Sequence, residues 1–323
     1  MQFQRLLTTI DAHAAGEPLR LITGGFQEFN RDTIDIARKL LLMEPRGHHG
    51  MRGCVIKQAT SADSDFSVCF IDHEEVQDTD VHGIIAMVTT VLETGLFPVT
   101  GEIPRIVIDS PMGKIVAHAR CRGVEVESVS FENDVAFVWA SDVPITLDHR
   151  TVTVDIAYGG AFYALVKARD LGVKVEINQL PSLQEWGRRI RAQIEDEMTI
   201  RHPLQKETSR ICGVVISDEP HEKDAHLYSV TIQSNGQVLR SPGEGGTCAL
   251  LATLFQRERI KQGEKLIHES MIGTQLQGMV SRTQPIASYQ GVVPCIKGRA
   301  FITGMHQFVL DPDDPLSEGF LLG

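Results

Sequence analysis

The sequence predicts an α+β fold made of two similar halves, and three features of the chain support this prediction. Runs with strand composition are many, long helical runs are few, and the two do not alternate as they do in a doubly wound sheet. Two polar turns about half the chain apart, at 78–83 and 240–247, each lead into a short apolar helix. The length of 323 residues favours two domains with separate cores.

Composition narrows the functional classes. A hydrophobic content of 42% and a charged content of 23% are ordinary for a soluble globular protein. The formal net charge of −11 argues against binding to nucleic acid or to an anionic membrane. No apolar run approaches the length of a membrane span, and the first residues lack the basic and apolar regions of a signal peptide. The six cysteines are scattered without a CxxC pair, which predicts reduced thiols in a cytoplasmic protein and no metal site.

The first half is expected to open with a strand at 6–10, followed by a turn that contains His13 and Glu17. Hydrogen bonding within the turn is preferred over ligand contact as the role of both residues. A helix is predicted over 32–43 with Asp32 as its N-cap. The loop after it carries His48 and His49, and adjacent histidines are poorly spaced to bind one metal. Further strands are expected at 54–58, 65–71, 105–109, 114–120, 124–130 and 135–139.

The second half is also rich in strands. Ser182 and Glu185 form a capping box that predicts the start of a helix. Four apolar residues then keep helical spacing, which indicates a stripe that faces the core: Leu183, Trp186, Ile190 and Ile194. Strands are expected at 152–157, 212–217, 227–233, 265–269 and 300–303. The sequence contains no P-loop or dinucleotide fingerprint.

The glycine-rich turn at 240–249 is the strongest functional signal. Gly243, Gly245 and Gly246 allow positive φ angles and a close approach of the backbone to a ligand. Thr247 is predicted to cap the apolar helix that follows. The unpaired N–H groups and the dipole at such a helix start favour an anion, such as a carboxylate. A tight strand-to-helix turn without a ligand explains the pattern equally well.

Long segments of the chain resemble the proline racemase family, which includes proline racemase, 4-hydroxyproline epimerase and trans-3-hydroxyproline dehydratase. The similarity covers essentially the whole chain and lies mainly in the segments 11–20, 44–48, 155–163, 268–273 and 304–311. It implies the diaminopimelate-epimerase type of fold, in which each half wraps a sheet around a central helix. These helices are expected to start near His82 and Thr247. The resemblance also implies a small-molecule substrate, no cofactor and a homodimer.

The halves are expected to be 1–144 together with 300–323, and 145–299, with the active site in the cleft between them. Family racemases use two cysteines that remove a proton from Cα and return one. At these positions the present chain has Asp80 and Gly243. Leu239 replaces the aspartate that holds the substrate amine, and Glu244 replaces a glycine. The remaining turn positions keep the family pattern: His82, Gly83, Arg240, Ser241, Pro242, Gly246 and Thr247.

These departures lead to a carboxyl-based hypothesis. An isomerase or lyase would move a proton with Asp80, aided by Glu244 and His82, on a small carboxylic acid, cyclic acids included, that lacks the usual amine. A carboxyl group in an apolar cleft, or near a second carboxyl, can act as an acid or a base near neutral pH. The substrate would be bound by residues of the two turns, namely Gly83, Gly243, Gly245, Gly246 and Thr247.

Two alternatives stay open. The chain could be a conventional trans-3-hydroxyproline dehydratase, or a proline or hydroxyproline racemase or epimerase, in which other side chains compensate for the missing cysteines. It could also be a family member without catalytic activity that binds a small molecule. For Asp80 itself the simplest structural role is that of a helix N-cap, a position that aspartate favours. Cys248 follows the turn and is not expected to replace either catalytic cysteine.

Overall fold

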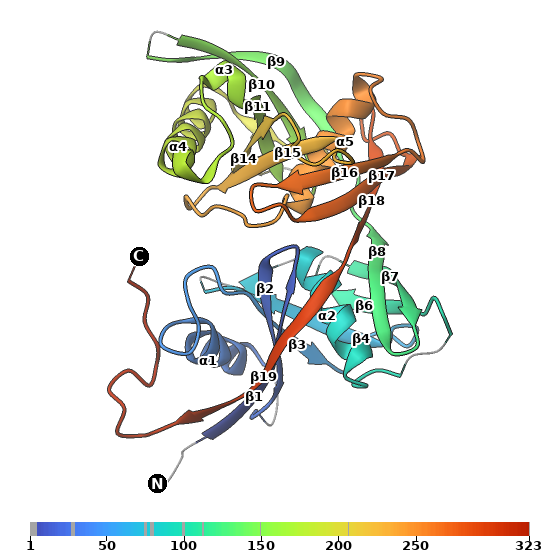
Figure 1. Cartoon of the computed structure of the whole chain (residues 1–323), viewed down its shortest axis with the longest axis vertical. Helices are drawn as coiled ribbons and strands as arrows, with labels where there is room; N and C mark the ends of the chain where they lie inside the picture. Colours follow the sequence, from blue (N-terminus) through green and yellow to red (C-terminus); the bar gives the residue numbers. More distant parts are fainter. Residues whose placement is uncertain are drawn as a thin grey trace. The chain divides into compact units, whose positions relative to one another are not determined.

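The computed structural model describes residues 5–26, 30–73, 76–77, 81–98, 101–111, 113–148, 150–205 and 207–322 (Figure 1). The chain forms two compact units, Met1–Phe131 with Gly298–Gly323, and Glu132–Lys297. The first boundary therefore lies earlier than the expected position after Pro144. The reason is strand β9 (Phe137–Leu147), which pairs along its length with β10 (Arg150–Tyr158) of the second unit.

The first unit contains one mixed sheet in the order β19, β1, β2, β3, β4, β6, β7, β8. The pairs β2–β3 and β4–β6 are parallel and all the others are antiparallel. The strands are β1 (Arg5–Ala14), β2 (Glu17–Gly24), β3 (Gly53–Lys57), β4 (Phe66–Ile71), β6 (Arg105–Ser110), β7 (Gly113–Arg122), β8 (Glu125–Glu132) and β19 (Ala300–Leu310). A short strand, β5 (Val76–Gln77), adds to β4.

The second unit repeats this topology. Its sheet runs β9, β10, β11, β14, β15, β16, β17, β18, and β11–β14 and β15–β16 are the parallel pairs. The strands are β11 (Phe162–Lys167), β14 (Ile211–Asp218), β15 (Leu227–Gln233), β16 (Lys265–Ser270), β17 (Gln275–Thr283) and β18 (Val292–Gly298). The short pair β12 (Ile200–Arg201) and β13 (Thr208–Ser209) lies outside this sheet. Each parallel pair needs a crossover, and a helix lies in each of the long crossovers.

One buried helix occupies the centre of each unit. Helix α2 (Val81–Glu93) packs against β19, β1, β2, β3 and β7, and α5 (Glu244–Gln256) packs against β9, β10, β11 and β17. Because each helix touches strands far apart in its sheet, the sheet curves around the helix (Figure 1). The residues from His82 to Leu92 and from Gly245 to Thr253 are buried. The predicted α+β class, with apolar central helices, is confirmed.

A second helix covers the outer face of each sheet. Helix α1 (Arg31–Leu42) buries an apolar stripe against β1–β4, and α4 (Leu180–Glu197) buries Leu183, Ile190 and Ile194 against the second sheet. The predicted caps differ from the observed ones. Asn30, not Asp32, caps α1 through a capping box with Thr33, and α4 begins two residues before Ser182, with a proline in its first turn. The short helices α3 (Ala168–Leu171) and η1 (Ile177–Gln179) precede α4.

The part of the chain that the structure describes contains neither a membrane-spanning helix nor a cluster of metal-binding side chains. None of its helices has the length and apolar character that crossing a membrane requires. Within the same residues, no group of three or more His, Cys, Asp or Glu side chains is placed to hold a metal ion.

Candidate functional site

Helix α5 begins at the glycine-rich turn and places five predicted site residues in one turn of helix. Gly243 is the N-cap, with φ 77° and ψ 114°, and Glu244 is the first helical residue. The helix therefore starts three residues before Thr247, and the prediction that Thr247 caps it is wrong. Thr247 instead donates both its backbone N–H (2.8 Å) and its hydroxyl (2.6 Å) to the carbonyl oxygen of Gly243.

The conformation of Gly243 is one that suits glycine only. Its positive φ disfavours an L side chain. A Cβ on Gly243 would lie 3.1 Å from Leu239 Cδ1 and 3.1 Å from Thr231 Oγ1, so a side chain would point towards these two buried residues. The turn around Gly243 is therefore built for glycine.

The next two glycines admit close neighbours from the sheet. A Cβ on Gly245 would lie 2.4 Å from the Tyr163 hydroxyl oxygen, and one on Gly246 would lie 3.0 Å from Val215 Cγ2. A Cβ on Gly159, in the turn before β11, would lie 2.2 Å from the Gly245 carbonyl oxygen. These glycines let the β10–β11 hairpin press against the first turn of α5. Within the described residues, no acceptor faces the N–H groups of Gly245 and Gly246, as expected near a helix start.

Tyr163 was not singled out from the sequence, although it belongs to a segment that carries the resemblance. The side chain is half-buried on β11 and lies against the start of α5, next to Glu244. Burial raises the pKa of the Tyr163 phenol well above its usual value, and the nearby Cys212 and Glu244 raise it further. The phenol therefore stays protonated and can donate a hydrogen bond. The signal that could have found it is the Gly159–Gly160 pair, which brings β11 close to the helix.

A chain of hydrogen bonds runs behind this turn. The Thr247 hydroxyl lies 2.8 Å from His268 Nδ1, and His268 Nε2 lies 2.8 Å from the Ser229 hydroxyl. All three side chains have an exposed fraction of 0%. Burial lowers the pKa of His268 to about 3, so its imidazole is neutral. The chain links β15 and β16 to the first turn of α5.

The equivalent turn of the first unit begins helix α2. His82 and Gly83 lie in the first turn of this helix and are buried. Asp80 immediately precedes α2 in the sequence, as Gly243 immediately precedes α5, but Asp80 lies outside the described residues. The structure thus brings together Glu244 and Thr247 with the three glycines of the second turn. His82 and Gly83 belong to the other unit.

Other residues noted in the sequence have structural roles. Cys248 is fully buried in α5, its thiol accepts a hydrogen bond from Asn133 at 3.4 Å, and burial raises its pKa to about 12. It is therefore not a reactive thiol, as predicted. His13 Nδ1 accepts a hydrogen bond from the Gly16 N–H at 3.2 Å, which confirms the preferred turn role. Ring atom Nδ1 of His48 lies 2.9 Å from the His49 carbonyl oxygen, in an exposed loop.

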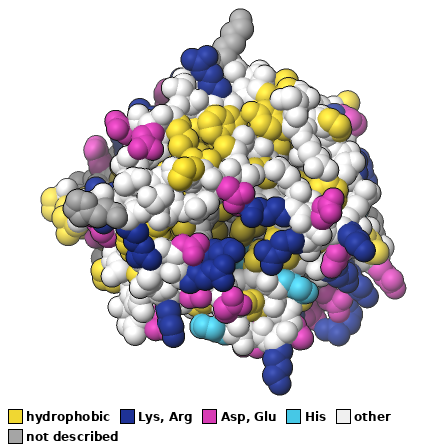
Figure 2. Space-filling model, turned by 90° about the horizontal axis from the view of Figure 1, so that it is seen from above, with side chains coloured by type: hydrophobic (Ala, Val, Ile, Leu, Met, Phe, Trp, Pro, Cys, Tyr) yellow, Lys and Arg dark blue, Asp and Glu magenta, His cyan; other side chains and the backbone are white. Residues whose placement is uncertain are grey.

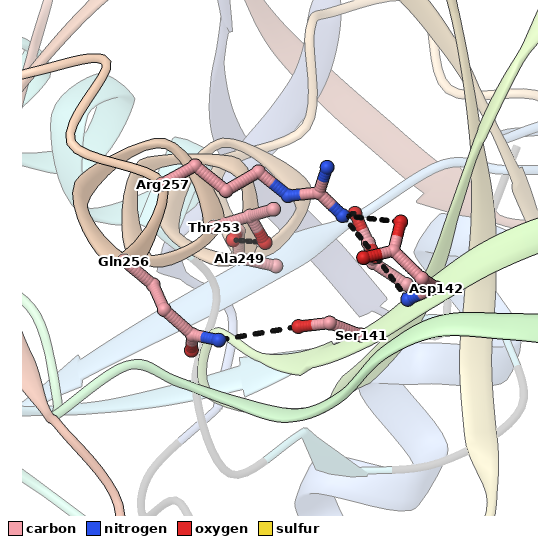
Figure 3. Close-up of polar contacts among 7 residues, drawn as sticks. Ser141, Asp142, Ala249, Thr253, Gln256 and Arg257 are labelled. Atoms are coloured by element: carbon pink, nitrogen blue, oxygen red, sulfur yellow. Dashed lines mark hydrogen bonds and ion pairs between the residues drawn. The ribbon is translucent and has the colours of Figure 1, made fainter.

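Each unit also has a cavity at the C-terminal end of its central helix, away from the glycine-rich turn. The cavity of the first unit, about 690 Å³, is lined by residues that include Val91, Leu96 and Phe97. That of the second unit, about 330 Å³, is lined in part by Arg257, which bonds to Asp142 (2.9 Å) and Asp155 (2.8 Å) (Figure 3). Figure 2 shows basic and acidic side chains interspersed over the face that it displays. The charge of Arg257 is offset by its two carboxylate partners.

The comparisons with known proteins agree with this geometry. The family sequence model described as "Proline racemase" matches residues 9–321. The chain belongs to the proline racemase family. A trans-3-hydroxy-L-proline dehydratase of Bacillus cereus is 48% identical over 100% of both chains, and a proline racemase of Clostridioides difficile is 35% identical over 100% of both. Among solved structures, a hydroxyproline epimerase from Agrobacterium vitis with bound trans-4-hydroxy-L-proline has a TM-score of 0.86 at 29% identity, covering 100% of this chain and 96% of that one.

These comparisons confirm the fold and the family that the resemblance implied. The proline racemase family comprises cofactor-independent isomerases and dehydratases. At the glycine-rich turn of this chain, Gly243 takes up a positive-φ conformation that disfavours an L side chain. The chemistry that the turn can support is therefore that of Glu244, Tyr163 and backbone N–H groups.

Proposed function

We propose that the chain is a cofactor-independent lyase that eliminates water from a small cyclic 3-hydroxy acid, with trans-3-hydroxyproline as the first substrate to test. The observation that carries the proposal is the 48% identity, over 100% of both chains, with a protein named trans-3-hydroxy-L-proline dehydratase. The chemistry of the turn supports it. Racemisation needs a proton-transfer group on each face of Cα, whereas elimination needs only one base at Cα and an acid at the leaving oxygen.

The proposed step conserves atoms and electrons. Asp80 takes the proton from Cα, and the C–H electron pair forms the Cα=Cβ double bond. The Cβ–O bond then breaks, and the departing hydroxyl takes a proton from the carboxyl group of Glu244 to leave as water. The product of a 3-hydroxyproline would be a cyclic enamine. No oxidant, reductant or cofactor is needed for this step.

The first turn of α5 would hold the substrate carboxylate. The N–H groups of Gly245 and Gly246 lie at the positive end of the helix, and anions bind favourably there. The same N–H groups would stabilise the negative charge that builds on the carboxylate as the Cα proton leaves. Tyr163 would assist as a neutral hydrogen-bond donor beside Glu244. His82, which follows Asp80 in the sequence, would assist the proton transfer by Asp80.

A second candidate substrate is a cyclic hydroxy acid without an amine. Leu239, which is 6% exposed, replaces the aspartate that holds the amine in the family. A leucine cannot pair with an ammonium group, so the amine of a proline-type substrate would lack this partner. A carbocyclic β-hydroxy acid, such as 2-hydroxycyclopentane-1-carboxylate, would undergo the same elimination without needing that partner.

The test is a turnover assay followed by ¹H NMR in D₂O. The purified protein is incubated with trans-3-hydroxy-L-proline, L-proline, trans-4-hydroxy-L-proline or 2-hydroxycyclopentane-1-carboxylate. We expect loss of the Cα and Cβ proton signals for a 3-hydroxy acid. For L-proline we expect no exchange of the Cα proton and therefore no racemisation. Elimination only from the carbocyclic acid would identify the second candidate. Absence of both elimination and Cα exchange for all four compounds would contradict the enzyme assignment.

We also propose that the protein is a cytoplasmic homodimer, as the resemblance implies. Multi-angle light scattering on the purified protein tests the oligomeric state. A molar mass of twice the 35.7 kDa chain is the expected result, and a mass equal to one chain would contradict it.

A further inference from the structure

The hydrogen-bond chain behind the first turn of α5 has a defined direction. The Thr247 hydroxyl has a single proton, which it donates to the Gly243 carbonyl oxygen at 2.6 Å. At its contact with His268 Nδ1 it must therefore accept, so the proton of the imidazole is on Nδ1. The Nε2 atom is then an acceptor and receives the proton of the Ser229 hydroxyl at 2.8 Å. This is the reverse of the tautomer that a free imidazole favours in water.

The chain ends on the peptide group that opens the helix. The Gly243 carbonyl oxygen receives two donors from Thr247, its hydroxyl and its N–H, and this fixes the plane of the Gly243–Glu244 peptide. In a trans peptide the C=O and the N–H point in opposite directions. The carbonyl points into the helix, so the Glu244 N–H points out of its start, towards the side where an anion would bind.

We propose that His268 is a positioning residue that, through Thr247, holds the Gly243–Glu244 peptide so that the first N–H of α5 faces the carboxylate of the substrate. The inference rests on the proposed function for its catalytic consequence, and on the hydrogen bonds alone for its geometry. The complete burial of Ser229, Thr247 and His268 shields their hydrogen bonds from bulk water. The position of the Glu244 N–H matters because negative charge develops on the substrate carboxylate when Cα loses its proton.

The geometric part is tested by NMR of the protein labelled with ¹⁵N in its histidines. Two-bond ¹H–¹⁵N correlations distinguish the two neutral tautomers and the imidazolium. We expect His268 to be neutral with its proton on Nδ1 at pH 5.5 and at pH 8, because it is buried next to hydroxyl partners. The variant Thr247→Val should change this pattern. A wild-type His268 protonated on Nε2, or on both nitrogens, would overturn the assigned direction of the chain.

The functional part is tested by kinetics on whichever substrate the wild-type protein turns over. Thr247→Val keeps the size of the side chain and removes the hydroxyl. We expect kcat to fall about tenfold with little change in KM, because the net contribution of one hydrogen bond corresponds to about that factor. Thr247→Ser should restore most of the rate. His268→Asn, which can keep a donor near Nδ1, should retain more activity than His268→Leu.

A matched control lies in the same helix. Thr253 donates its hydroxyl to the Ala249 carbonyl oxygen at 2.9 Å, which is the same kind of bond to the fourth preceding residue (Figure 3). Among the described residues, no histidine forms a hydrogen bond with the Thr253 hydroxyl. Thr253→Val should therefore leave kcat unchanged. If Thr247→Val folds and keeps the wild-type kcat, the positioning role is wrong. If the wild-type protein has no activity, the proposed function fails, while the NMR result still decides the direction of the chain.

Discussion

Leu239 and Gly243 pack against each other across the turn before α5, with Leu239 Cδ1 3.1 Å from the point that a Cβ on Gly243 would occupy. The resemblance to the family implies that these two positions correspond to the amine-binding aspartate and the second cysteine. Leu239 fills the space beside a residue whose positive φ of 77° disfavours a side chain.

The first prediction follows from this packing. Gly243→Ala should lower the free energy of unfolding by about 1–2 kcal/mol from the left-handed backbone alone, and by more because of the contacts with Leu239 and Thr231. Gly236→Ala is the matched control, since Gly236 has φ 84° and no atom within 4 Å of its would-be Cβ. Chemical denaturation of both variants measures the difference. Equal losses would show that the contact with Leu239 contributes nothing.

The same relationship bears on restoring the family chemistry. We expect Gly243→Cys combined with Asp80→Cys to give no proline racemisation while Leu239 remains, because the new side chain points at Leu239 and the substrate amine has no partner. Adding Leu239→Asp relieves both problems. Polarimetry measures racemisation of proline. If the variant with Gly243→Cys and Asp80→Cys racemises proline while Leu239 remains, the turn adjusts freely around a cysteine.

The second prediction concerns Cys248. Because burial raises the pKa of its thiol to about 12, almost none of it is thiolate at pH 8. Iodoacetamide should therefore label the partly exposed Cys212 before it labels Cys248, as measured by mass spectrometry of the native protein. Rapid labelling of Cys248 with loss of activity, prevented by substrate, would mean that Cys248 is the family thiol and that the turn is misaligned.

The third prediction concerns stability and pH. The pKa of His268 is about 3 in the folded protein and near 6.5 when unfolded, so the unfolded state binds more protons between these values. The contribution of His268 to stability is therefore fully present above pH 6.5 and is lost as the pH falls towards 3. The difference in unfolding free energy between the wild-type protein and His268→Asn should shrink over that window. A difference that stays constant from pH 7 to pH 4 would contradict a buried neutral imidazole.

The fourth prediction separates a site tyrosine from a structural one. Tyr163→Phe removes the hydroxyl that touches the start of α5, and we expect a lower kcat with little loss of stability. Tyr228→Phe removes a buried hydroxyl that donates to the Val175 carbonyl oxygen at 2.6 Å. That variant should lose about 1–2 kcal/mol of stability and keep its kcat. The reverse pattern would show that Tyr163 has no part in the reaction.

The fold could be predicted well from the sequence because its signals are local. The apolar helix after each polar turn and the helical spacing of Leu183, Ile190 and Ile194 are properties of neighbouring residues, and both were confirmed. The predicted helix starts were less accurate. Asn30 and Gly243 are the observed N-caps, but nearby residues of types that also favour the N-cap position could not be distinguished from them by sequence. The packing of Tyr163 and His268 on the turn depends on strands that are distant in the sequence, so residue spacing could not reveal it.

The central claim is that carboxyl groups do the work of the missing cysteines, and Asp80→Asn tests it most directly. The substitution keeps the size of the side chain and much of any capping hydrogen bond, so the fold should survive, as checked by circular dichroism. Loss of a general base typically lowers the rate about 10²–10⁴-fold, and we expect a loss of that order in Cα–H exchange and elimination measured by NMR in D₂O. If Asp80→Asn, with Glu244→Gln tested beside it, turns over the substrate at the wild-type rate, the carboxyl mechanism is wrong.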